Sequence, residues 1–271
     1  MGNQPTSQTQ SSIDQGIVNA SRQFRYPHKI ITLLRHGQSE HNVVYDTEQR
    51  DPCVFDAPLT KVGHQQATKM IPECQSANPE LIIVSPLSRA LQTALLAFPA
   101  EKHPSARFEV WAEHTEHLEA ACDIGSSKDD LQQRFPQFDF SDLPDVWWYT
   151  PEECDSNDPL EGRRVFTEFG YFEPQVHLES RIDQLVARLK NRPETRIALV
   201  GHADCFNCLL SRYFESDKWM RNCEIYTVVM DLNVEIYHPP GLKDIPVAAS
   251  APTERPASNV WTTEDDLGLL E

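Results

Sequence analysis

The stretch TLLRHGQSEHN, from Thr32 to Asn42, places arginine, histidine and glycine directly after a short apolar run. Arg35 and His36 are costly to bury unless an anion or a hydrogen-bonding group meets them. The alternative is that a strand simply ends here and both side chains reach water. Because tripeptides of this kind recur by chance, the rest of the chain has to distinguish the two interpretations.

Polar residues follow three further apolar runs in the same way. Ser85 and Arg89 come after the second run, and His202 comes after the fourth. Three glutamates come after the third run: Glu113, Glu116 and Glu119. If the runs are neighbouring parallel strands, their carboxyl ends bring all these side chains to one edge of a sheet, where ligands bind in such folds.

Arginines, histidines and carboxylates at one edge are suited to phosphoryl transfer. The arginine fork donates paired hydrogen bonds to phosphate oxygens and stays charged. A histidine acts as a nucleophile when one ring nitrogen is held as a donor and the other is left free. A carboxylic acid can protonate the leaving oxygen. These residue types therefore predict a phosphomonoester as the substrate.

The elements that would position these residues alternate between strands and helices. The apolar runs are too short for helices and too continuously apolar for half-exposed strands: Lys29–Leu34, Leu81–Val84, Phe108–Trp111, Ile197–Val200 and Ile225–Met230. Helices are expected after Thr60 as N-cap, over Leu87–Phe98 and over 177–192. The pattern predicts an α/β fold, a mainly parallel central sheet with helices on both faces.

The motifs of the chain resemble the histidine phosphatase superfamily, in its phosphoglycerate mutase-like branch. The RHG stretch is followed in order by DAPLTKVGHQQA (56–67), VSPLSRALQTA (84–94) and VGHADCFNCLL (200–210). The similarity covers roughly residues 29 to 237. It implies a phosphoglycerate mutase-like fold with an inserted cap region at about 126–173.

The resemblance also implies roles for individual residues. His36 would take the phosphoryl group as a phosphohistidine, which water would then hydrolyse. Phosphate oxygens would be held by three side chains: Arg35, Arg89 and His202. Further contacts to the substrate are expected from Gly37, Ser39, Asn42 and Ala203. Gly37 is explained by the close approach of the backbone to phosphate.

The general acid is expected to be Glu116, with Glu119 as the second candidate. Relatives place a glutamate several residues ahead of a segment that is CDIGS (122–126) in this chain. Glu113 lies nearer the strand and is expected at the surface. Asp204 follows the second histidine where many relatives have glycine. We expect it to cap the next helix, although it could instead orient a histidine ring or discourage an anionic substrate tail.

Three functions remain open, and a phosphatase is favoured over the other two. Glycolytic mutases carry N-E-R-x-Y-G-x-L-x-G where this chain has TEHLEAACDIGSS, which supplies acids in place of the arginine and tyrosine. A non-catalytic phosphate-binding module is the third, since fold does not fix function. In the cap region, Trp147, Trp148 and Tyr149 are expected to pack in the core. Arg163 and Arg164 are expected at the surface.

The net charge of −17 argues against nucleic acid as a partner, because such binding needs a basic face. Seven cysteines, an odd number, favour reduced thiols in the cytoplasm or nucleus. Cys205 and Cys208 are expected to be buried apolar residues, and neither a metal nor a cofactor is required.

One domain is expected over residues 24–237, between a disordered polar N-terminus (1–23) and a Pro-containing acidic tail (238–271). The first residues match the pattern for myristoylation of Gly2, which would give only weak membrane association. No apolar run approaches the roughly 18 residues that span a bilayer. The sequence makes no prediction of the oligomeric state.

Overall fold

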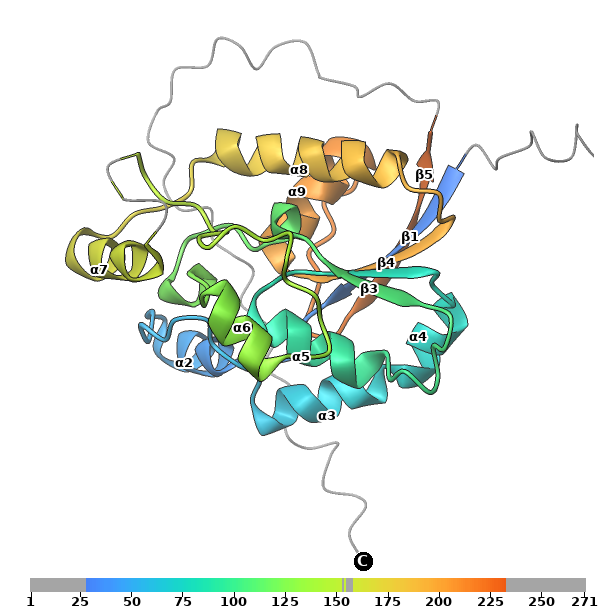
Figure 1. Cartoon of the computed structure of the whole chain (residues 1–271), viewed down its shortest axis with the longest axis horizontal. Coiled ribbons are helices and arrows are strands. Elements are labelled where there is room, and N and C mark those ends of the chain that lie inside the picture. Colours follow the sequence, from blue (N-terminus) through green and yellow to red (C-terminus); the bar gives the residue numbers. More distant parts are fainter. Residues whose placement is uncertain (1–27, 153, 155–157, 233–271) are drawn as a thin grey trace, which may run out of the picture.

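A five-stranded sheet lies at the centre of the computed structural model, which describes residues 28–152, 154 and 158–232 (Figure 1). The strand order is β3-β2-β4-β1-β5, and all neighbours are parallel except β5, which runs antiparallel to β1. The strands are β1 (His28–Arg35), β2 (Leu81–Val84), β3 (Arg107–Val110), β4 (Arg196–Gly201) and β5 (Ile225–Asp231). The predicted mainly parallel sheet is confirmed.

Helices cover both faces of this sheet, as predicted (Figure 1). On one face lie α8 (Gln175–Lys190) and α9 (Ala203–Tyr213). On the other lie α3 (Lys61–Lys69), α4 (Ile71–Ala77) and α5 (Ser88–Ala97). Thr60 caps α3 as predicted, because its side chain accepts a hydrogen bond from the N–H of Gly63. The sequence interpretation missed α2 (Glu40–Glu48), α4, α6 (Lys128–Arg134) and α7 (Pro159–Phe169).

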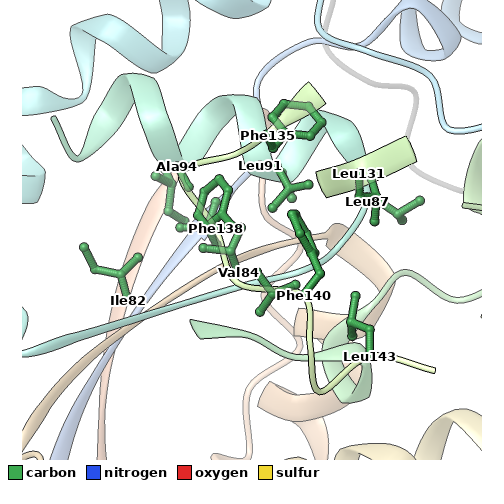
Figure 2. Packing of buried hydrophobic residues seen from close by; sticks show 14 of the residues in the cluster. Ile82, Val84, Leu87, Leu91, Ala94, Leu131, Phe135, Phe138, Phe140 and Leu143 are labelled. Carbon is green, nitrogen blue, oxygen red and sulfur yellow. The ribbon is translucent and has the colours of Figure 1, made fainter. Parts of the chain in front are cut away.

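The inner strands β1, β2 and β4 are largely apolar because alternate side chains enter different cores, whereas the edge strands β3 and β5 are partly exposed. In β2, Leu81 and Ile83 pack with residues of α8 and α9. Ile82 and Val84 point to the opposite side, where they pack with α5 and with Phe138 (Figure 2). Burial on both faces therefore explains the continuous runs that predicted the strands.

The aromatic residues after position 126 extend the second of these cores. Trp147 and Trp148 are buried there and the half-buried Tyr149 packs against the same core, which confirms that these aromatic residues are core rather than ligand lining. The indole N–H of Trp147 donates to the carbonyl of Ser126 at 3.0 Å. Gly125 lets the ring approach, because a Cβ at that position would lie 2.0 Å from it.

The two arginines of α7 behave differently from each other. Arg164 is exposed and pairs with Glu161 and Glu168, as expected for surface charge. Arg163 donates to the carbonyl of Gly125 at 2.7 Å and stacks over Phe55, so it helps to hold the loop before α6.

The predictions for residues 1–23 and 238–271, and for myristoylation of Gly2, lie outside the described residues. Within the described ranges, no helix is long and apolar enough to cross a bilayer.

Candidate active site

A cavity of about 160 Å³ lies at the carboxyl ends of β1, β2 and β4. Its lining is drawn from α2, the loop after β3, the start of α9 and the segment before β5: Arg35, His36, Ser39, His41, Asn42, Tyr45, Arg89, Glu116, His117, Glu119, Ala120, Cys122, Asp123, Ala203, Asp204 and Trp219. It is smaller than the roughly 300–1,000 Å³ of pockets that enclose drug-sized ligands. Its size suits a phosphoryl group with part of its leaving group.

His36 follows the last residue of β1 and is buried, with 3% of its surface exposed. Its Nδ1 lies 2.7 Å from the carbonyl oxygen of Gly37, which can only accept a hydrogen bond. Its Nε2 lies 3.2 Å from Nε of Arg89, which can only donate. The two partners therefore assign the proton to Nδ1 and a free lone pair to Nε2. Burial, together with the charges of Arg89 and Arg35, holds the pKa of His36 well below 6.5, so the ring is neutral.

Arg89 lies in the first turn of α5 and is held on its far side. Its Nη1 donates to the carbonyl of Cys122 at 2.6 Å, and its Nη2 donates to the carboxylate of Asp123 at 2.8 Å. The start of α5 is itself anchored by Asp56, whose carboxylate accepts from the N–H and hydroxyl of Ser88. These contacts aim the guanidinium at His36.

Arg35 ends β1 and enters the cavity from the other side. Its Nη1 donates to the carbonyl of Met220 at 2.8 Å, whereas its buried Nε has no hydrogen-bond partner among the described residues. Burial lowers the pKa of Arg35, and the carboxylates of Glu116 and Asp204 oppose that shift. An unpartnered buried donor beside His36 is well placed for an anion.

His202 follows β4 and is completely buried, but it is not among the residues that line the cavity. Its ring centroid lies 5.2 Å from that of His36. Its Nε2 lies 2.7 Å from the hydroxyl of Ser85, while its Nδ1 has no hydrogen-bond partner in the described part of the chain. Burial and the neighbouring charge of Arg89 hold the pKa of His202 well below 6.5. That His202 contacts the phosphate stays a prediction.

Glu116 and Glu119 are separated clearly by the fold. Glu116 lines the cavity and is only 8% exposed, whereas Glu119 is exposed at its mouth and lies 3.3 Å from Nδ1 of His117. Burial raises the pKa of Glu116, and the charge of Asp123 raises it further. Arg89 and nearby backbone N–H groups oppose this shift. Glu113 pairs with Arg188 instead.

The expectation that Asp204 caps α9 is wrong. The helix begins at Ala203, and no side chain at its N-cap position accepts from it. The capping group is the carboxylate of Glu116, which accepts from the backbone N–H of Ala203 at 3.1 Å and of Cys205 at 3.0 Å. Asp204 is left in the first turn, where it lines the cavity.

The structure gives a second reason for glycine at position 37, and its approach to phosphate stays a prediction. Gly37 is not among the lining residues, and its N–H donates to the hydroxyl of Thr93. A Cβ at Gly37 would lie 2.6 Å from the carbonyl oxygen of Gly63 on α3. Glycine is therefore needed here for the contact between two backbone segments.

Ser39, Asn42 and Ala203 all line the cavity, but each also shapes the backbone around it. Ser39 is the N-cap of α2, and its backbone N–H and hydroxyl both donate to the side-chain oxygen of Asn42. That oxygen also accepts from the side chain of Asn222. Their contacts to a substrate stay predictions.

Residues 31–232 match the family model of the histidine phosphatase superfamily (branch 1). The chain belongs to the histidine phosphatase superfamily. It is 28% identical over 150 residues to a Schizosaccharomyces pombe protein described as a probable phosphatase, covering 52% of this chain and 67% of that protein. It is 26% identical over 247 residues to a phosphoglycerate mutase-like protein of Arabidopsis thaliana, covering 74% and 84%.

Solved structures of histidine phosphatase fold proteins are also similar to this chain. One is a mycobacterial glucosyl-3-phosphoglycerate phosphatase, at 20% identity and a TM-score of 0.45, covering 73% of this chain and 90% of that one. Another is an Entamoeba histolytica phosphoserine phosphatase, at 20% identity and a TM-score of 0.43, covering 73% and 89%.

Several residues of this histidine phosphatase site were missed from the sequence. Asp123 follows Cys122 in the CDIGS segment, which was used only as a spacing marker. Arg181 is buried on the predicted 177–192 helix. The sequence signal for it is a charged residue at helical spacing from the apolar Leu178 and Leu185. His117 and Trp219 carried no signal, because neither belongs to a motif.

The described part of the chain holds no cluster of three or more histidine, cysteine or acidic side chains able to bind a metal. Cys205 and Cys208 are both buried on α9, as expected for small apolar residues. Burial raises the pKa of Cys208 to about 11 and that of Cys205 well above 9.0.

No described residue between 126 and 173 lines the cavity. That this region caps the pocket stays a prediction. In the described structure its aromatic side chains pack in the core beside the sheet.

Proposed function

We propose that this protein is a phosphatase that hydrolyses a small phosphomonoester through a phosphohistidine on Nε2 of His36. The observation that carries the proposal is the fixed tautomer of that ring. A neutral imidazole presents an unprotonated nitrogen to a cavity that also holds the guanidinium groups of Arg35 and Arg89. An electron-rich nitrogen beside two permanent cations suits an attack on a dianionic phosphate.

The first step forms a bond from Nε2 of His36 to phosphorus and breaks the bond from phosphorus to the ester oxygen. Arg89 exchanges its contact with Nε2 for a phosphate oxygen, and Arg35 uses its free Nε for another. Glu116 gives its proton to the departing oxygen, which leaves as the alcohol. The raised pKa of Glu116 favours the protonated form that this step needs.

The second step returns the enzyme to its starting state. The Glu116 carboxylate takes a proton from water, and the water oxygen attacks phosphorus. The bond from phosphorus to Nε2 breaks, and inorganic phosphate leaves. These steps use side chains of this chain alone, so removal of divalent metals with a chelator is expected to leave the rate unchanged.

A mutase is disfavoured by the charges around the cavity. A bisphosphate intermediate needs cations for a second phosphate, yet the two lining arginines both lie beside His36. Outward from them the lining carries Glu119 and Asp204.

The test is hydrolysis of p-nitrophenyl phosphate by the wild type and by His36→Ala. We expect the wild type to turn over and the variant to lose about 10³-fold or more in kcat, the scale seen when a nucleophile is removed. His64→Ala, at an exposed histidine of α3, is the matched control. Rapid quenching should trap acid-labile phosphate on the wild type only. Phosphate binding without turnover of any phosphomonoester would instead indicate a binding module.

A further inference from the structure

The outer part of the cavity combines two carboxylates with two aromatic side chains. Glu119 and Asp204 line it together with Tyr45 and Trp219. Glu119 is exposed, and the other three are half-buried. We refer to these four residues as the mouth. Their partial exposure places them nearer to solvent than His36 and Glu116, which are buried.

The positive charges of the lining are already engaged. Arg89 is paired with Asp123 at 2.8 Å and contacts His36. His117 lies between Glu119 and the carbonyl of Glu173; although burial alone would lower its pKa, these two contacts raise the pKa of His117 to about 9. Its positive charge is therefore already opposed by Glu119.

The remaining lining groups give no further cation for a second anion. His41 has the carboxylate of Asp51 3.8 Å away. Arg35 is needed for the phosphate, and the charges that act on it are those of Glu116, Asp204, Asp46 and Arg89. A carboxylate or second phosphate on a leaving group would thus meet two carboxylates, of which Glu119 is offset by His117 and Asp204 acts on Arg35, and every cation of the lining is already engaged. Like charges brought together in this way disfavour a ligand strongly.

The aromatic pair suits the opposite kind of leaving group. Faces of tyrosine and tryptophan attract cations and also bury flat or apolar groups. Carboxylates next to such faces add attraction for an ammonium group. The aromatic faces and the carboxylates of the mouth therefore both favour a cationic group on the alcohol part of the substrate.

From this arrangement we infer that the mouth selects phosphomonoesters whose alcohol part is uncharged or cationic and rejects those that carry a carboxylate or second phosphate. The inference rests on the proposed phosphatase function and names its substrate class. Glu119 and Asp204 are the specificity-determining residues, and Tyr45 and Trp219 provide the walls.

The experiment compares kcat/KM for two substrates that differ in one group. Glycerol 3-phosphate and 3-phosphoglycerate have the same three-carbon chain, with a neutral hydroxymethyl in one and a carboxylate in the other. We expect the wild type to prefer glycerol 3-phosphate by about tenfold or more, the scale of like-charge discrimination. Phosphoethanolamine, which carries an ammonium, is expected to be used at least as well as glycerol 3-phosphate.

The double variant Glu119→Gln/Asp204→Asn should shrink this preference to about threefold or less, because its mouth is neutral. The control Glu101→Gln/Asp129→Asn makes the same change in net charge at exposed sites outside the cavity, so it should keep the wild-type ratio. Raising the salt from about 0.01 M to about 1 M should narrow the wild-type preference, because the screening length falls from about 30 Å to about 3 Å.

Two results would overturn the inference. One is equal kcat/KM for glycerol 3-phosphate and 3-phosphoglycerate in the wild type. The other is the same ratio of these two kcat/KM values in the mouth variant and in the control variant. Hydrolysis of p-nitrophenyl phosphate, run in parallel, separates these from failure of the proposed function. Absence of turnover with every substrate would remove the phosphatase proposal, and the inference with it.

Discussion

The guanidinium of Arg181 donates two hydrogen bonds to the carboxylate of Glu173, from Nε to Oε1 at 2.7 Å and from Nη2 to Oε2 at 2.8 Å. Both residues are buried, and neither lies next to the other in sequence. The same guanidinium donates to the backbone carbonyls of Thr115 and Glu116, at 2.7 and 2.9 Å. This buried pair therefore positions the loop that carries the expected general acid.

Arg181→Met is expected to destabilise the protein and to lower kcat. Removing one partner of a buried pair costs about 3–5 kcal/mol, because the remaining charge stays buried without compensation. The backbone carbonyls of Thr115 and Glu116 also lose their hydrogen-bond donor, so the position of Glu116 and its proton donation should be impaired. Chemical denaturation measures the first effect, and kcat on a substrate with a poor leaving group measures the second.

A double-mutant cycle checks that prediction. Arg181→Met with Glu173→Gln should cost clearly less than the sum of the two single changes, since the second leaves no buried charge unpaired. Arg164→Met is the matched control, because Arg164 is exposed and its ion pairs should contribute about 0–1 kcal/mol. Additive single effects would contradict the role assigned to the pair.

The pH dependence of kcat/KM should follow Glu116 and His36. The pKa of Glu116 is raised above 4.5, so the active protonated form persists to higher pH. The rate falls once the pH rises through this raised pKa. The pKa of His36 is lowered below 6.5, so the nucleophile stays neutral to lower pH and the acid limb shifts down. Activity is expected to be highest where Glu116 is protonated and His36 is neutral.

Glu116→Gln should abolish the alkaline limb and lower kcat by about 10²–10⁴-fold for alkyl phosphates, the usual contribution of a general acid. The loss should be smaller for p-nitrophenyl phosphate, whose leaving group needs no proton. Glu119→Gln should retain the alkaline limb. If Glu119→Gln abolished it and Glu116→Gln did not, the two assignments would have to be exchanged.

Asp123→Asn should weaken phosphate binding. Asp123 holds Arg89 with one carboxylate oxygen, and its other oxygen accepts from the backbone of Glu119 and Ala120. An amide cannot balance the buried charge of Arg89, so we expect about a tenfold or larger rise in the inhibition constant for inorganic phosphate. Asp145→Asn, in an exposed pair with Lys128, is the control and should leave that constant unchanged.

Gly63→Ala should be destabilising, although alanine is the better helix former. A Cβ at Gly63 would lie 2.1 Å from the carbonyl oxygen of Gln38, in the loop that follows His36. Overpacking against backbone costs about 1–3 kcal/mol, whereas in a helix free of this contact alanine would gain about 0.5–1 kcal/mol. Gln65→Ala, on the exposed side of the same helix, should stay within about 0.5 kcal/mol of the wild type. A more stable Gly63→Ala variant would refute the contact.

The order of apolar runs and polar residues along the chain was enough to predict the sheet and the edge where its polar residues gather. Residues such as Ile82 and Ile83 are apolar because opposite faces of the strand enter different cores, and that local pattern is visible without coordinates. The motifs around His36 and Arg89 likewise predicted which side chains meet, since each directly follows a strand or begins the next helix.

What holds those residues, and which of the two lining glutamates is buried, follows from contacts between distant parts of the chain. Glu116 and Glu119 are three positions apart in one loop, and although the spacing to CDIGS favoured Glu116, it gives no physical reason for a difference in burial. Glu116 is buried because the N-terminus of α9, close to 90 residues later in the chain, supplies N–H donors for its carboxylate. Such hydrogen-bond partners depend on segments that packing brings together, whereas periodicity records only whether each position is buried or exposed.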